Sequence, residues 1–346
     1  MESLRNEILK QGKDLYNQTC MDCCKLITER YSTTTSIALK MIAKKYQYPI
    51  YSIYAFDRYM DELMDNYDDK DRKTLFVKFM ADTYEAIDSG FSTNPILHAF
   101  QYTANKYGID KDLIKSNFRS IEMDLEIKLY DESQFKEYVY GIFEVPMLMC
   151  LKVLSEGDNS MYEKLKKPMM KFGSAYQKLN CFRDIKEDYE LNGRVYFAGL
   201  DYPHITEKLK RSIEEDIQRD LDEAFLAVDH LPHDIRSGYK IFVLLKQKLL
   251  DEIKRLPSEA LLHQRIRLSN AQKLFIILKE KKYSILNLLI ISIPLLLFFG
   301  HKIYNLSNEW EIFSIIIATT AFFLLCSILF TKSDTLRGLL VSLLNH

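Results

Sequence analysis

The amino-acid sequence predicts an all-α protein, a helical domain followed by a C-terminal transmembrane helical hairpin. Over residues 1–282 apolar residues recur at spacings of three and four, and almost no alternating stretch is long enough for a strand. Only 11 glycines and 8 prolines interrupt the 346 residues, so long helices can form. Two apolar runs follow. We expect a helical domain over residues 1–282, a hairpin over 283–331 and a short cytoplasmic or interfacial tail over 332–346.

The charge balance argues against a nucleic-acid partner. Lys and Arg number 47 and Asp and Glu 48, and no basic stretch is interleaved with aromatic residues. The six cysteines form no paired framework, and the N-terminal residues lack the apolar core of a signal peptide. Cys20, Cys23 and Cys24 cluster, but no second Cys/His cluster completes a tetrahedral metal site. We therefore expect reduced thiols in a cytosolic domain.

Glycine, proline and asparagine mark the expected ends of the helices. The breaks fall at Pro49 near a helix start, Gly90 to Pro95, Gly108, Gly157 to Asn159, and Asn192–Gly193. No internal linker is evident between residues 1 and 282, which predicts one domain there.

The stretch around Asn180-Cys-Phe-Arg-Asp carries the strongest chemical signal. If it is helical up to Asn192–Gly193, four polar side chains share one face. They are Gln177, Asn180, Asp184 and Asp188. Two carboxylates one turn apart, with no cation between them, suit a hard divalent cation held by oxygen ligands. Arg183 and Arg194 bracket the acids and could hold an anion, which suggests diphosphate chemistry.

A second copy of the acidic spacing strengthens this interpretation. Asp61 and Asp65 also lie one helical turn apart, with Tyr54 and Arg58 on the preceding turns. A single copy is ordinarily a solvated helix face, because charged helices produce this spacing by chance. Two copies more than one hundred residues apart, each beside an arginine, favour a metal site.

Several motifs in this order resemble the squalene and phytoene synthases, bacterial phytoene synthases in particular. The resemblance covers roughly residues 15 to 275. It is carried by Arg30 to Ser36, by Asp61-x-x-x-Asp65 with Tyr54 and Arg58, by Asn180-x-x-Arg183-Asp184-x-x-x-Asp188 with Gly193-Arg194-x-Tyr196, and by Arg265 to Asn270.

The resemblance implies an isoprenoid-synthase fold with a central cavity and a prenyl transferase. Two prenyl diphosphates, farnesyl or geranylgeranyl, would condense head to head through a cyclopropyl diphosphate. Mg²⁺, or Mn²⁺ in its place, would be held between the aspartates Asp61, Asp65, Asp184 and Asp188. No glycine-rich dinucleotide fingerprint is present, which favours a phytoene-type product formed without NADPH over reductive squalene formation.

Other site residues have structural as well as functional interpretations. Ser32 and Thr34 precede an apolar helix and would ordinarily act as N-caps, whereas the resemblance places them on a flap over the diphosphate. Tyr54 belongs to an aromatic stretch typical of core packing, but a tyrosine ring can also stabilise a carbocation. The resemblance places Tyr54 in the active cavity, and we expect Tyr196 to line it too.

Residues 138–151 are almost entirely apolar and predict a buried helix. The sequence departs from its relatives here, since the family has small residues where this chain has Phe143 and Met147. Pro146 also removes a backbone donor inside the helix. The two larger side chains imply a shorter space for the prenyl tail.

The C-terminal hairpin would anchor the enzyme to a membrane. The run from Ile312 to Phe330 is long enough to cross a bilayer, and the shorter run from Ile285 to Phe299 pairs with it across a short polar loop. Basic residues before and after the hairpin outnumber the single Lys302 in the loop, which predicts cytoplasmic ends and a cytoplasmic catalytic domain. Membrane lipid is thus an expected partner, and residues 336–344 could lie along the interface.

Three other functions remain open. A squalene or dehydrosqualene synthase differs only in product, and product analysis with and without NADPH separates it. A terpene cyclase is disfavoured by the matched pair of acidic motifs. A non-catalytic, membrane-bound assembly factor would have little need of all four aspartates, and their presence favours an enzyme.

Overall fold

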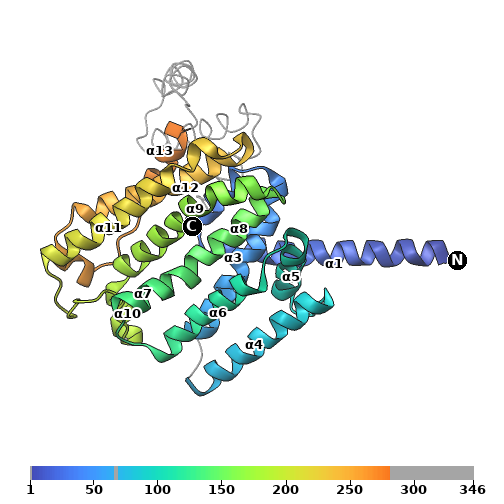
Figure 1. Ribbon diagram of the computed structural model, residues 1–346, viewed down its shortest axis with the longest axis horizontal. Coiled ribbons are helices and arrows are strands. Elements are labelled where there is room, and N and C mark those ends of the chain that lie inside the picture. Colours follow the sequence, from blue (N-terminus) through green and yellow to red (C-terminus); the bar gives the residue numbers. More distant parts are fainter. Residues whose placement is uncertain (1, 66–68, 281–346) are drawn as a thin grey trace, which may run out of the picture. The chain divides into compact units, whose positions relative to one another are not determined.

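The computed structural model describes residues 2–65 and 69–280, which are helical and contain no strand (Figure 1). The helices are α1 Glu2–Tyr31, α2 Thr33–Lys40, α3 Lys44–Asp65, α4 Asp69–Ser89, α5 Pro95–Tyr107, α6 Lys111–Glu126, α7 Glu132–Val139, the π-helical turn η1 Tyr140–Glu144, α8 Val145–Ser155, α9 Asn159–Arg183, α10 Ile185–Asn192, α11 Glu207–Phe225, η2 Val228–His230, α12 His233–Lys254, η3 Ser258–Leu262 and α13 Asn270–Glu280. The predicted all-α class is confirmed for these residues.

The chain divides into two units, residues 1–268 and 269–346. The first unit contains α1 to α12, and α13 belongs to the second. The predicted hairpin at 283–331 and the tail at 332–346 lie outside the described residues.

Most of the predicted helix ends are confirmed. Ser32 is the N-cap of α2, where its hydroxyl accepts a hydrogen bond from Thr35 N at 3.1 Å. Gly108 and Gly193 end α5 and α10 in the left-handed conformation, which glycine adopts without strain. Pro49 differs from expectation, because α3 begins at Lys44 and the proline lies in its second turn.

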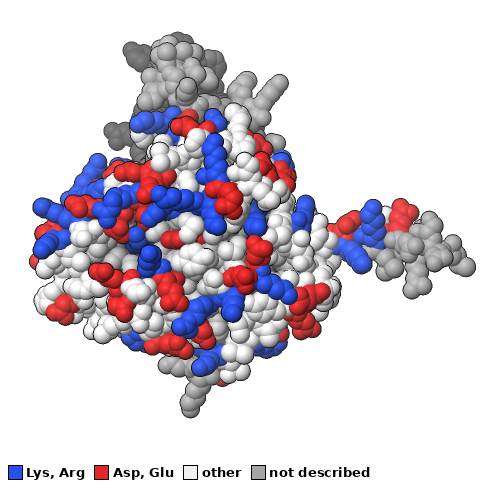
Figure 2. All heavy atoms as spheres, viewed as in Figure 1, with Lys and Arg blue, Asp and Glu red and all other residues white. Residues whose placement is uncertain are grey.

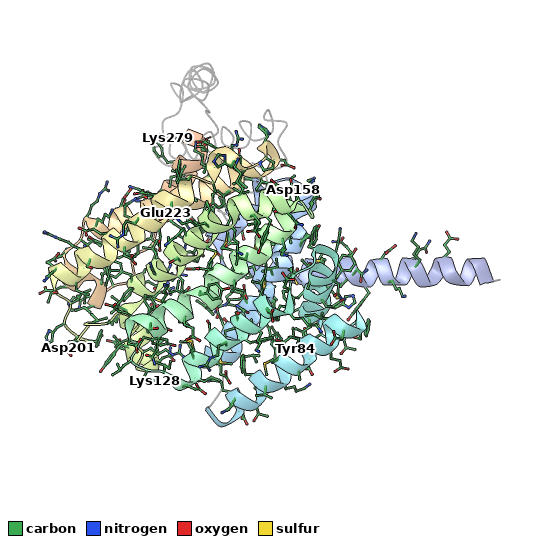
Figure 3. All side chains as sticks on the ribbon, in the orientation of Figure 1. Tyr84, Lys128, Asp158, Asp201, Glu223 and Lys279 are labelled. Atoms are coloured by element: carbon green, nitrogen blue, oxygen red, sulfur yellow. The ribbon has the colours of Figure 1, made fainter. Side chains whose placement is uncertain are left out.

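Helix α9 lies at the centre of the first unit, in contact with α8, α11, α12 and η1 (Figure 1). Its N-cap Asp158, labelled in Figure 3, accepts a hydrogen bond from Met161 N at 3.0 Å. Phe172, Leu179 and Phe182 on α9 are completely buried. Each such side chain contributes about 1.5–3 kcal/mol through burial of apolar surface. This packing fixes α9, which carries much of the second acidic motif.

The predicted apolar helix at 138–151 is present but not regular. It runs from Glu132 to Ser155 and widens into a π-helical turn at η1, where Val145 N–H donates to Tyr140 O. Pro146, at the start of α8, cannot donate a backbone hydrogen bond, and the wider turn accommodates it. Among the described residues this is the one helix long and apolar enough to cross a membrane, and it is mostly buried inside the protein.

Acidic and basic side chains are interspersed over the face shown in Figure 2. Many form ion pairs on or between neighbouring helices, such as Lys78 with Asp82 on α4 and Lys167 on α9 with Glu223 on α11. No single-sign field that would attract a polyanion extends over this face.

Candidate active site

Helix α3 presents the first acidic motif beside Arg58. The Arg58 guanidinium lies 3.6 Å from the Asp61 carboxylate, pairs with Glu62, and sits 4.4 Å above the centroid of the Tyr31 ring. Its Nε atom is buried and has no hydrogen-bond partner in the described part of the chain. Arg58 therefore keeps a donor for an anion. Asp65 is the last residue of α3, and its side chain is not among those that the structure describes.

The second acidic motif spans a bend, so the expectation of one continuous helix up to Asn192 is wrong. Helix α9 ends at Arg183, and Asp184 has φ −103° and ψ 14° before α10 begins. Asp184 N–H still donates to Asn180 O at 2.9 Å, and Asp188 N–H donates to Asp184 O at 2.9 Å. The bend separates Asn180, on α9, from Asp188, on α10.

Two arginines hold the Asp184 carboxylate. Arg183 Nε donates to Oδ1 at 2.7 Å, and Arg265 donates from Nε to Oδ1 at 2.8 Å and from NH2 to Oδ2 at 3.0 Å. Arg265 also pairs with Glu187 at 3.0 Å. Arg265 lies in one of the family-like motifs, but its sequence position predicts no role in the site. Its distance of 81 residues from Asp184 explains why spacing did not reveal the contact.

Ser32 connects the two acidic motifs. Its side chain interacts with the phenols of both Tyr54 on α3 and Tyr176 on α9. Tyr54 is within electrostatic reach of Arg58 and Asp61, and Tyr176 is within reach of Arg183 and Asp184. Burial raises the pKa of both phenols, so they are neutral at physiological pH. We call the five charged residues of this site the charged rim: Arg58, Asp61, Arg183, Asp184 and Arg265.

Tyr176 was not among the predicted site residues. Tyr176 is adjacent to the predicted site residue Gln177 on α9, but aromatic residues at helical spacing usually belong to the core. Thr34 is half-buried on α2, and the capping role falls to Ser32.

Arg194 and Tyr196 belong to a buried network around Asp124 on α6. The three hydroxyls of Tyr130, Tyr196 and Tyr138 donate to this carboxylate at 2.8, 3.1 and 3.2 Å. An Arg194 NH group lies 3.6 Å from the carboxylate, and a second donates to Asp124 O at 3.2 Å. Burial raises the pKa of Asp124, and the arginine and the hydroxyls oppose that shift.

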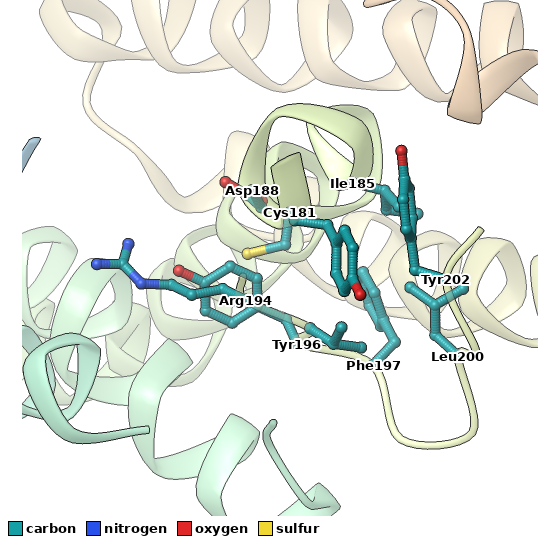
Figure 4. A pocket seen from close by; sticks show the side chains of 10 residues that line it. Cys181, Ile185, Asp188, Arg194, Tyr196, Phe197, Leu200 and Tyr202 are labelled. Atoms are coloured by element: carbon teal, nitrogen blue, oxygen red, sulfur yellow. The ribbon is translucent and has the colours of Figure 1, made fainter. Parts of the chain in front are cut away.

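This network adjoins the rest of the second motif. Gln177 Nε2 donates to the Tyr138 hydroxyl at 3.4 Å and lies 3.5 Å from Cys181 Sγ. Figure 4 shows a small pocket lined by Cys181, Asp188, Arg194 and Tyr196 with neighbouring apolar side chains. Asp188 therefore lies between the Asp124 network and the bend at Asp184. Sequence spacing could not show that Asp124, Tyr130 and Tyr138 meet Arg194.

Phe143 and Met147 lie in the interior of the same unit. Phe143 is half-buried and stacks on Tyr176, with ring centroids 3.9 Å apart and planes 15° apart. Met147 is 7% exposed. Phe143 thus packs against the ring whose hydroxyl end also contacts Ser32.

The acidic side chains of this site could hold Mg²⁺ only together with other ligands. No three His, Cys, Asp or Glu side chains gather to hold an ion by themselves within residues 2–65 and 69–280. Mg²⁺ usually takes one or two carboxylates, with substrate phosphate and water supplying the other ligands. Asp61 on α3 and Asp184 at the C-terminal end of α9 fit that arrangement in donor chemistry.

An all-α bundle that carries two acidic motifs, each paired with arginines, is typical of the isoprenoid synthases. Solved structures support this class. A dehydrosqualene synthase in complex with ligand aligns with a TM-score of 0.68 at 18% identity, over 77% of this chain and 97% of that one. Squalene synthase HpnC from Alicyclobacillus acidocaldarius aligns with a TM-score of 0.61 at 18% identity, over 70% and 95%.

The chain belongs to the squalene/phytoene synthase family, whose sequence profile matches residues 28–272. A 4,4'-diapophytoene synthase of Staphylococcus haemolyticus (strain JCSC1435) is 24% identical over 200 residues, which cover 57% of this chain and 67% of the relative. A phytoene synthase of Arthrospira platensis is 24% identical over 262 residues, covering 68% and 84%. The family resemblance seen in the motifs is therefore confirmed.

Proposed function

We propose that this protein condenses two prenyl diphosphates head to head through a cyclopropyl diphosphate, with release of diphosphate, as a Mg²⁺-dependent phytoene synthase-like enzyme. Membership of a family of head-to-head prenyl synthases supports the reaction class. The single observation that carries the proposal is the Ser32 contact to Tyr54 and Tyr176. This contact supports a single site formed by both acidic motifs.

The charged rim would bind the diphosphate. Arg58 has a buried Nε donor without a partner, and Arg183 and Arg265 offer charge-assisted hydrogen bonds once they turn from Asp184 to an incoming anion. When bound by Asp61, Asp65, Asp184 and Asp188, Mg²⁺ would act as a Lewis acid on the leaving diphosphate. Exchange of Arg265 between Asp184 and diphosphate would couple anion binding to release of the carboxylate.

The neutral side chains would shape the cavity around the reacting carbons. Tyr54, Gln177 and Asn180 lie on the helix faces that carry the acids, and Ser32 and Thr34 would cover the diphosphate from α2. Tyr196 is held by Asp124. Since Arg194 is only 5% exposed, its part would be to keep this buried carboxylate and Tyr196 in place beside Asp188.

The product and the tail length define the alternatives within this class. Phe143 and Met147 occupy interior space, which favours farnesyl over geranylgeranyl diphosphate. The Staphylococcus relative's name as a diapophytoene synthase makes a dehydrosqualene-type product the nearest alternative to phytoene, with squalene next.

Incubation of the purified full chain with Mg²⁺ and either diphosphate, with and without NADPH, tests the proposal by mass spectrometry of the lipid extract. A head-to-head C30 or C40 hydrocarbon formed without NADPH is the expected result. Hydrocarbon formed only with NADPH would indicate a squalene synthase. Absence of any condensed product would overturn the enzymatic function and favour a non-catalytic assembly factor.

We further propose that residues 283–331 anchor the enzyme as a two-helix hairpin with the catalytic domain on the cytoplasmic side. The sequence pattern of the two apolar runs and their flanking lysines supports this. A tag at His346 should be protected from impermeant reagents in intact cells. Labelling of that tag from outside would show that the orientation is reversed.

A further inference from the structure

The ring of Tyr176 is covered on both faces. Phe143 stacks on it at a centroid distance of 3.9 Å, and Lys246 Nζ lies 3.1 Å from the Tyr176 ring centroid. At these distances two groups cannot occupy the same face of one ring without overlapping. Phe143 and Lys246 therefore lie on opposite faces, and we call the three residues the layered stack.

The backbone holds Phe143 against Tyr176. The π-helical turn η1 brings Phe143 next to α9, where a Cβ atom added to Gly173 would lie 2.8 Å from Phe143 O and 2.7 Å from Glu144 Cα. Only glycine permits so close an approach of the two helices. Since Gly173 is one turn before Tyr176, this contact sets Phe143 over the tyrosine ring.

The other side of the stack is equally constrained. Lys246 on α12 is 4% exposed, so its ammonium is held inside the protein beside an aromatic face, a favourable cation–π arrangement. Phe242, one turn earlier on α12, packs edge-on against the Tyr176 ring at 5.5 Å. Tyr176 thus has almost no freedom to rotate.

Tyr176 joins the charged rim to the interior. Its hydroxyl end interacts with Ser32 and Thr35, within reach of Arg183 and Asp184, and its ring extends to Phe143. With both ring faces covered, the ring cannot present a π face to a carbocation. The ring can therefore act only as a steric barrier next to the charged rim.

We propose that Tyr176 is a specificity-determining residue that limits the length of prenyl tail, and that Lys246 is a positioning residue that holds it. This inference rests on the proposed prenyl diphosphate substrates. A tail whose diphosphate is bound at the rim must extend into the apolar interior and meets the layered stack. A packed protein interior accommodates added side-chain or ligand volume poorly. A C15 tail should therefore bind more readily than a C20 tail.

Binding of unreactive analogues tests this without turnover. Farnesyl and geranylgeranyl thiodiphosphate are titrated calorimetrically, with Mg²⁺, into the detergent-solubilised full chain. Tyr176→Leu should shift the ratio of the two affinities toward the C20 analogue by about tenfold, the effect of one or two newly buried methylenes or methyls. Tyr176→Phe keeps the ring and is the matched control, so its ratio should stay at the wild-type value.

Lys246 is tested through the same ratio. Lys246→Met removes the ammonium but keeps an unbranched stem, which should loosen the ring and shift the ratio in the same direction by a smaller factor. Lys246→Arg keeps a cation at this position, so its ratio of the two affinities should stay at the wild-type value. If Tyr176→Leu does not fold, the comparison of Lys246→Met with Lys246→Arg decides the outcome.

An unchanged ratio in Tyr176→Leu, with native helicity and the C15 analogue still bound, would overturn this inference alone. An equal shift in Lys246→Met and Lys246→Arg would overturn the role of Lys246. Wild-type protein that binds neither analogue would overturn the proposed function, and this inference with it.

Discussion

The charged rim and the layered stack are built in different ways. Most rim contacts are local: Arg58 pairs with Asp61 and Glu62 within a turn, and Arg183 holds the adjacent Asp184. The stack joins residues from three helices, separated by 33 positions or more. Side chains that meet through helical spacing can be predicted from sequence, whereas those that meet through packing cannot.

The two regions also differ in what a substitution should damage. Side chains of the rim are partly exposed, 45% for Asp61 and 34% for Arg265, so their ion pairs add little to stability. Stack residues are enclosed by neighbours and contribute to the core. Substitutions in the rim should therefore remove activity and leave the fold, and those in the interior should affect selectivity and stability together.

The largest expected effect is loss of turnover when a rim carboxylate becomes an amide. Asp61→Asn and Asp184→Asn should each lower turnover by about a thousandfold, because the amide cannot neutralise the cation that stabilises the leaving diphosphate. Helicity should be retained in both. Asp184 is the exception to the weak rim ion pairs, because its side chain is only 15% exposed, and Asp184→Asn should also cost about 1–2 kcal/mol of unfolding free energy as two arginines lose a charged partner.

Asp82→Asn on α4 is the matched control, because Asp82 forms an exposed pair with Lys78. It should keep wild-type turnover. Product formation within about tenfold of wild type in both rim variants would show that these acids do not hold a metal needed for ionisation.

The next effect concerns Arg265 and separates its two proposed partners. Arg265→Gln should raise the KM for prenyl diphosphate about tenfold, the contribution of one charge-assisted hydrogen bond. It should also lower the Mg²⁺ concentration for half-maximal activity, because Asp184 loses a competing cation. Arg267→Gln, two residues away and exposed, is the control. If the KM and the Mg²⁺ requirement move in the same direction, Arg265 does not exchange between carboxylate and anion.

A third prediction concerns the interior. Phe143→Ala combined with Met147→Gly should shift the ratio of rates toward geranylgeranyl diphosphate, because overpacking that costs about 1–3 kcal/mol for the longer tail is relieved. The variant will be less stable. A ratio of two rates from one preparation is independent of the folded fraction, so it remains interpretable. Phe91→Ala, at the exposed turn after α4, is the control; an unchanged ratio in the double variant would show that neither residue limits the tail.

Local signals predicted much of the fold and the site. Gly108 and Gly193 end helices where the left-handed conformation is needed, and Ser32 caps α2. Spacing also singles out Asp61 and Asp184, and their part in metal binding stays a prediction. The bend at Asp184 was missed, because nothing in the adjacent sequence revealed that Arg265 would hold this carboxylate.

Tertiary contacts account for the other differences. Arg194 has the spacing of a rim residue, but it pairs with Asp124, 70 residues earlier. Pro146 predicted a disturbed helix without specifying a π-helical turn, whose position depends on the close approach of Gly173. Tyr176 and Lys246 carry no distinguishing sequence pattern at all.

The smallest expected effect is a pH dependence that originates at Glu144, the last residue of η1. Burial raises the pKa of this carboxyl to about 7, Asp220 adds to the rise, and Lys171, Lys178 and Ser174 oppose it. The ordinary value is 4.5. Between these two values the folded protein holds a proton on Glu144 that the unfolded chain releases.

Stability must then fall as pH rises through this window, because the unfolded state binds fewer protons. Below pH 4.5 both states are protonated at Glu144, and above pH 7 the penalty is complete. The unfolding free energy of wild type minus that of Glu144→Gln should decrease by about 2 kcal/mol across the window, a value reduced from the full shift for partial solvent access. Urea unfolding at several pH values measures this difference. A flat or rising difference would show that Glu144 ionises normally, and that the turn which carries Phe143 to Tyr176 is open to water.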